Sequence, residues 1–119
     1  MNYNTVLEAF CLMADLTPEK AEEFSNVVEI STDYIERSLK ENIDISDKRL
    51  VLLAGALCNL KYNEILSSRE EMRISENGKI RSKALDNEII VNARSLYNGL
   101  REMCSDLLIG EGFVFEGIQ

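Results

Sequence analysis

Nine consecutive residues without a polar side chain, Leu50 to Cys58, form the longest apolar run in the chain. A helix built from such a run is apolar on every side, so it has to be buried on most sides or packed between neighbours. The run is too short to cross a bilayer as a helix, which takes about 20 residues. Gly55, between Ala54 and Ala56, allows a second helix to approach closely. We therefore expect other helices to cover it on most sides, and a single small helical layer has few ways to do so without a neighbouring subunit or partner.

Helix start and stop signals divide most of the chain into four predicted helices. Thr5 and Glu8 have capping-box spacing and open a helix to about Ala14. Thr17 and Pro18 open a second helix, which runs to about Lys40. The apolar run belongs to a third helix over residues 47–68, and a fourth spans 84–108. That last helix carries apolar residues at steps of three and four: Leu85, Ile89, Ala93, Leu96, Leu100, Met103 and Leu107.

A β-hairpin is predicted over residues 72–82. Asn77-Gly78 is a strong two-residue turn signal, because both residues tolerate positive φ. The turn places Glu76 opposite Lys79, and the arms contribute Ile74 and Ile80 as β-branched residues.

The predicted fold class is therefore mainly α: a small helical bundle of three to four helices with one β-hairpin and an extended C-terminal tail. The length of 119 residues suits a single domain over 1–119, with the tail as a C-terminal arm over about 110–119.

Negative charge gathers in the first part of the chain. Residues 1–47 hold eleven acids and three bases, residues 48–119 hold ten of each, and the formal net charge is −8. This excess argues against nucleic acid or an anionic membrane as the main partner. The chain has no histidine, which excludes histidine-based acid–base catalysis and histidine-containing zinc sites. We expect no enzyme activity, no catalytic residues, no cofactor and no metal.

The three cysteines, Cys11, Cys58 and Cys104, lie in apolar helical stretches and form no CxxC pair. An odd number cannot form a closed set of disulfides, so we expect buried free thiols in a reducing compartment. No signal peptide follows Met1. These features predict a soluble cytoplasmic protein.

The C-terminal segment is apolar although the chain as a whole is acidic. Phe113, Val114, Phe115 and Ile118 lie within its last seven residues. A segment of this kind either folds back across its own helices or adds as a strand or arm to a neighbouring subunit or partner. The sequence leaves both alternatives open.

Several segments in a fixed order carry a resemblance to a known family. They are LAGALCNLKY at 53–62, the expected hairpin at 72–82, ARSLY at 93–97 with the helix that follows, and GEGFVF at 110–115. This order resembles small head–tail connector (adaptor or head-completion) proteins of tailed phages, prophages and phage-tail-like particles. The resemblance implies a homo-oligomeric ring of twelve or six copies, as a portal-side adaptor or a collar on the tail. It implies contacts with a portal protein, a tail-tube protein or a terminator protein, a lumen for DNA, no enzyme activity and no cofactor. The protein would assemble in the host cytoplasm and remain at the neck of the virion or particle.

The sequence thus predicts a structural ring subunit that acts by oligomerisation and docking. The predicted intersubunit or partner contacts are Phe113, Val114, Phe115 and Ile118 in the tail, and Ile74, Asn77, Gly78 and Ile80 in a docking hairpin. The alternative is a small acidic helical regulator that binds a single protein partner. Acidic residues 1–47 motivate that alternative, which predicts a salt-sensitive complex and no rings.

Overall fold

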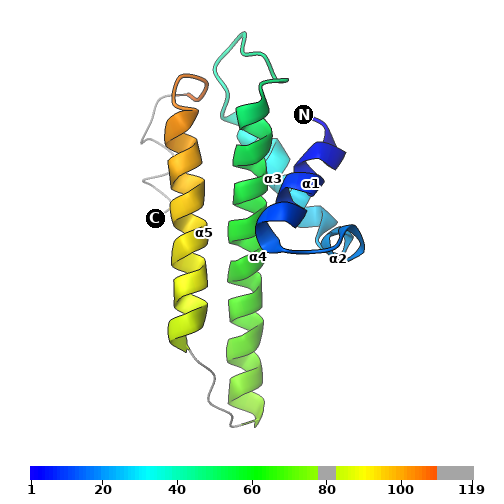
Figure 1. Ribbon diagram of the computed structural model, residues 1–119, viewed down its shortest axis with the longest axis vertical. Coiled ribbons are helices and arrows are strands. Elements are labelled where there is room, and N and C mark those ends of the chain that lie inside the picture. Colours follow the sequence, from blue (N-terminus) through cyan, green and yellow to red (C-terminus); the bar gives the residue numbers. More distant parts are fainter. Residues whose placement is uncertain (78–82, 110–119) are drawn as a thin grey trace.

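The computed structural model describes the backbone of residues 1–77 and 83–109, and the side chains of residues 1–69 and 87–109. These parts of the chain form α1 (Tyr3–Ala14), α2 (Pro18–Glu22), α3 (Ser25–Arg37), α4 (Lys48–Asn77) and α5 (Lys83–Met103). Figure 1 shows α4 and α5 running side by side along the long axis, with α1, α2 and α3 gathered on the other side of α4. The mainly helical class is confirmed for this part of the chain.

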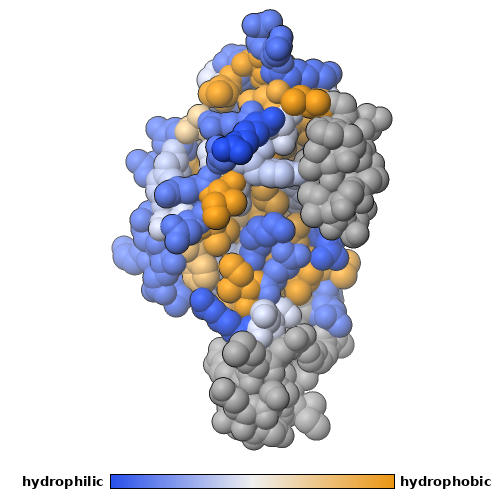
Figure 2. Space-filling view, turned by 180° about the vertical axis from the view of Figure 1, so that it is seen from behind, coloured by the Kyte–Doolittle hydropathy of each residue, from blue (hydrophilic) through white to orange (hydrophobic). Residues whose placement is uncertain are grey.

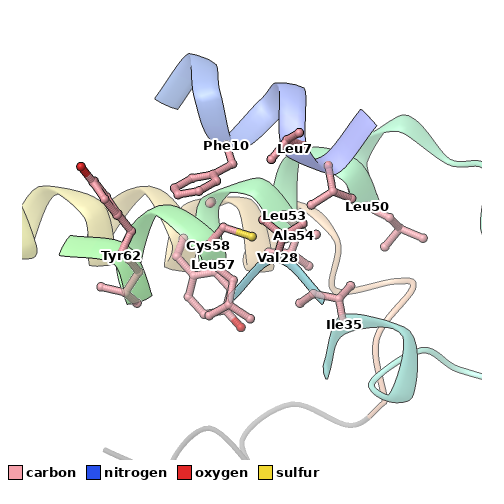
Figure 3. Packing of buried hydrophobic residues seen from close by; sticks show 14 of the residues in the cluster. Leu7, Phe10, Val28, Ile35, Leu50, Leu53, Ala54, Leu57, Cys58 and Tyr62 are labelled. Carbon is pink, nitrogen blue, oxygen red and sulfur yellow. The ribbon is translucent and has the colours of Figure 1, made fainter. Parts of the chain in front are cut away.

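Helix α4 lies at the centre, because α1, α3 and α5 each pack against it. Leu50, Leu53, Ala54, Ala56 and Cys58 have no exposed surface. Figure 3 shows residues from α1 and α3 converging on this segment of α4. Each buried leucine adds about 1.5–3 kcal/mol of transfer free energy. The prediction that the apolar run lies between neighbouring helices is therefore confirmed.

Gly55 is the point at which α1 approaches α4 closely. A Cβ atom placed on Gly55 would lie 2.6 Å from the Cβ of Ala9, and 3.2 Å and 3.3 Å from backbone atoms of Ala9 and Phe10. No side chain fits between the two helices there, so the backbones meet across a glycine. The expectation of a close helix approach at this position is confirmed.

The single helix predicted over residues 17–40 is wrong, because the chain forms two helices there. Thr17 caps α2 through a hydrogen bond that its Oγ1 accepts from Lys20 N, and Pro18 opens the helix as predicted. The helix then breaks at Glu23 and Phe24, and Phe24 adopts φ −112° and ψ 29°. This turn buries the Phe24 ring edge-on against Tyr62 of α4, with the ring centroids 4.8 Å apart. Packing of one aromatic side chain thus overrides helix continuity.

The predicted β-hairpin is not formed as expected, because α4 continues to Asn77. Residues 72–77 are helical, so the first arm of the hairpin is not a strand. Residues 78–82 lie outside the described part of the chain. Glu70, Glu71, Met72 and Arg73 are all good helix formers, and an Asn-Gly pair suits the end of a helix as well as a hairpin turn. The two signals compete in this sequence, and helix propensity prevails up to Asn77.

The ends of α3 and α5 are joined beside the start of α4. Leu39 and Leu108 form an isolated antiparallel bridge, in which Lys40 N donates to Leu107 O (2.9 Å) and Ile109 N donates to Ser38 O (2.7 Å). The Arg49 guanidinium forms ion pairs with Asp47 (3.0 Å) and Asp106 (3.1 Å). It therefore ties the start of α4 to the segment that follows α5.

Candidate functional site

A groove separates α3 from α5 and has α4 as its floor. Its floor is formed by Leu57 and Leu60, its α3 wall by Val27, Ile30 and Tyr34, and its α5 wall includes Tyr97. The volume is about 950 Å³. This is as large as the upper range of ligand pockets in proteins. In Figure 2, which views the molecule from behind, hydrophobic surface lies along the middle of the face with hydrophilic surface around it.

Charged side chains line the edges of this groove. Lys61, Arg94 and Arg101 contribute three positive charges, and Glu64 contributes one negative charge. Glu64 pairs with Lys61 at 3.4 Å and with Arg94 of α5 at 3.5 Å. The lining thus carries two more positive than negative charges, in a chain whose formal net charge is −8.

Tyr34 of α3 and Tyr97 of α5 both line the groove. Burial raises the pKa of both phenols, and the Arg101 guanidinium nearby opposes the rise in each. Both phenols are therefore neutral at physiological pH. They add hydroxyl groups to the groove, whose α5 wall also carries Arg94, Asn98 and Arg101.

A second candidate surface is the outer side of α5. Ile89, Leu96 and Met103 follow each other at intervals of seven residues and are 41%, 41% and 60% exposed. Residues seven apart share one side of a helix, with a drift of about 20° per step. Gly99 lies beside this stripe, and a Cβ placed on it would meet no atom within 4 Å. Helix α5 therefore presents an uncovered apolar stripe, which we call the α5 stripe.

The α5 stripe is one part of the apolar pattern that the sequence shows along this helix. The structure buries Ala93, Tyr97, Cys104 and Leu107. Of the other apolar positions in that pattern, Ile89, Leu96 and Met103 lie outside the core. The helix carries two apolar stripes, and only contact with α4 decides which one is buried.

The residues predicted from the sequence as contacts lie at the margins of the described structure. Ile74 and Asn77 are in the last turns of α4. The others, Gly78, Ile80, Phe113, Val114, Phe115 and Ile118, fall outside the described residues. Of the predicted contacts, the described part of the chain therefore includes Ile74 and Asn77 of the hairpin group and none of the tail group.

Within the part of the chain that the structure describes, no three cysteine or acidic side chains are grouped so that they could hold a metal ion. Cys58 and Cys104 have no exposed surface, and burial raises the pKa of the Cys58 thiol to about 11. A thiol of that kind is a poor nucleophile at physiological pH. Among the described helices, none has both the length and the apolar character needed to cross a membrane.

Comparison with protein-family models, curated proteins and solved structures gave no match for this chain. The groove and the α5 stripe are therefore defined by geometry alone. Sequence reasoning missed the groove, because its residues come from three helices and share no motif. The only available signal for the α5 stripe was the seven-residue spacing of Ile89, Leu96 and Met103, which is also typical of a core face.

Proposed function

We propose that this protein is a structural subunit of an oligomeric assembly, and that it joins its neighbours through the α5 stripe. The observation that carries the proposal is the exposure of Ile89, Leu96 and Met103 on one side of a 21-residue helix. Exposed apolar side chains that recur along one side of a helix, unlike ones scattered singly, indicate an interaction site.

The spacing of the α5 stripe suits a helix as its partner. A seven-residue repeat keeps one side of a helix in contact with a second helix over several turns. Gly99 leaves room beside the stripe for the backbone or a large side chain of that second helix. A copy of the same chain in a ring supplies such a helix at every interface.

We propose further that the assembly is a ring of the head–tail connector kind, as a portal-side adaptor or a tail collar. The support is the order of segments described above, with residues 53–62 in α4 and residues 93–97 in α5. The hairpin no longer contributes to this resemblance, because residues 72–77 are helical. The partners would be further copies, in twelve or six, and a portal, tail-tube or terminator protein. The ring would form in the host cytoplasm, enter the virion or phage-tail-like particle, and have no catalytic activity.

The experiment that tests this proposal is native mass by light scattering across a concentration series, with negative-stain images of the same sample. Rings of six or twelve copies would support it. A monomer that stays monomeric at every concentration, and also in the presence of purified portal or tail-tube protein, would contradict it. A one-to-one complex with a single partner that dissociates as salt is raised would instead favour the acidic regulator.

A further inference from the structure

We propose that the groove between α3, α4 and α5 is the binding site for the chain's own C-terminal segment, residues 113–118. This inference takes the fold-back alternative for residues that the sequence predicts as intersubunit contacts, and it leaves the ring proposal to depend on the opposite flank of α5.

The direction in which the chain leaves α5 is the first argument. The bridge between Leu39 and Leu108 is antiparallel, so residues 107 to 109 pass residues 40 to 38 in reverse order. Ile109 is held at Ser38, and Ser38 Oγ donates to Tyr34 O one turn further back along α3. Tyr34 is a wall residue of the groove. The chain is therefore heading along α3 into the groove when it reaches residue 110.

The length of the remaining chain is the second argument. Ile30, in the α3 wall, lies eight residues before Ser38 and thus about 12 Å away along the helix. An extended chain covers about 3.3 Å per residue, so four residues after Ile109 bring it level with Ile30. The fourth residue is Phe113. Gly110 to Gly112 then act as the connection past Tyr34, and the apolar residues begin level with Ile30.

Chemical complementarity is the third argument. Residues 113–118 contain Phe113, Val114, Phe115 and Ile118, which suit a floor of Leu57 and Leu60. Residues 110–119 contain two acids, Glu111 and Glu116, and no lysine or arginine. The groove lining has two more positive than negative charges, so the acidic C-terminal segment and the groove attract each other electrostatically.

Disulfide trapping at low protein concentration tests this inference. The variant pair is Ile30→Cys with Val114→Cys, which keeps Phe113, Phe115 and Ile118 in place. The matched control is Leu12→Cys with Val114→Cys. Leu12 is on α1, outside the groove, and is 79% exposed where Ile30 is 70% exposed. Both pairs carry Cys11→Ser, and Cys58 and Cys104 remain because they are buried.

The expected result is an intramolecular disulfide in the Ile30 pair that forms at least about tenfold faster than in the Leu12 pair, seen by intact mass and peptide mapping. Circular dichroism checks that both pairs are folded. Equal rates in the two pairs would overturn the inference and leave the groove to a ligand or a partner. A cross-linked dimer, including one from a mixture of the Ile30→Cys and Val114→Cys single variants, would overturn it in favour of a neighbouring subunit's segment.

Discussion

Gly55 of α4 and Ala9 of α1 face each other so closely that a methyl group on Gly55 would lie 2.6 Å from the Ala9 Cβ. Replacing Gly55 by alanine gains about 1 kcal/mol of helix propensity. The added methyl also meets backbone atoms of Ala9 and Phe10 at 3.2 Å and 3.3 Å, which cannot rotate away. Overpacking of this kind costs about 1–3 kcal/mol or more. We expect Gly55→Ala to lower the free energy of unfolding by about 1–2 kcal/mol in denaturant titrations.

Gly99 of α5 provides the matched control for that substitution. It also lies within a helix, but nothing surrounds its Cβ position within 4 Å. Gly99→Ala should therefore raise stability by about 0.5–1 kcal/mol. Adding Ala9→Gly to the Gly55→Ala variant should restore part of the loss. Equal stabilisation by the two alanine variants would show that α1 does not approach α4 as described.

Because of Arg49, we expect the stability of the protein to vary with pH in the acidic range. Its guanidinium lowers the pKa of Asp47 and Asp106 below their ordinary value of 3.8. A carboxyl whose pKa is lowered by folding stabilises the fold above its unfolded pKa, and this contribution is lost as pH falls through the folded value. Arg49→Gln should therefore reduce the melting temperature at pH 7, and the difference from the parent protein should shrink below about pH 4.

Arg37→Gln is the control for the Arg49 variant. Arg37 pairs with Asp33 at 3.0 Å within α3, and both side chains are exposed. Exposed ion pairs of this kind contribute little to the free energy of unfolding. The Arg37 variant should keep the melting temperature and acid profile of the parent protein. If both variants behave alike, the contact from Arg49 to Asp106 does not hold the start of α4 to the segment that follows α5.

Leu96→Glu should weaken self-association without unfolding the protein. Leu96 is in the middle of the α5 stripe, and a carboxylate there would be buried without a partner in any helix–helix interface. The matched control is Val91→Glu, since Val91 is 54% exposed on the same helix but lies off the stripe. Sedimentation velocity should show a shift towards the monomer for Leu96→Glu alone. An equal shift in both variants, or in neither, would argue against the stripe as the interface.

Cys11 should be the most reactive thiol of the folded protein. It is partly exposed, whereas Cys58 and Cys104 are buried. Burial raises the pKa of the Cys58 thiol to about 11, so almost none of it is thiolate at pH 8. A thiol reagent at pH 8 should give one fast phase, which Cys11→Ser abolishes. All three thiols should react in denaturant, and a fast phase that survives Cys11→Ser would contradict the burial of Cys58 or Cys104.

The sequence predicted the structure best where a single physical requirement, such as burial or helix capping, decided the local fold. A run without polar side chains has to be covered on most sides, so the burial of most of residues 50–58 could be predicted, although Leu52 is 41% exposed. Capping chemistry likewise located the start of α2 at Thr17 and Pro18. For α1, the sequence indicated a cap at Thr5, but Asn2 caps the helix by accepting hydrogen bonds from Asn4 N and Thr5 N.

Where the sequence is compatible with two local structures, contacts between helices determine which one forms. Those contacts cannot be read from the sequence. Helix α5 has two apolar stripes, and its packing on α4 selects the one that includes Ala93 and Tyr97. The break at Phe24 depends on Tyr62, which lies 38 residues further along the chain. The groove was not predictable for the same reason, because it exists only once three helices are in place.

The central place of α4 also has a consequence for how the protein folds during its synthesis. Helices α1 and α3 are synthesised before α4, on which they pack, so Val6, Phe10, Val28 and Ile35 lack that cover while the nascent chain is short. That early segment, residues 1–47, holds eleven acids and three bases. We expect the like charge of such segments to oppose association between unfinished chains until α4 emerges.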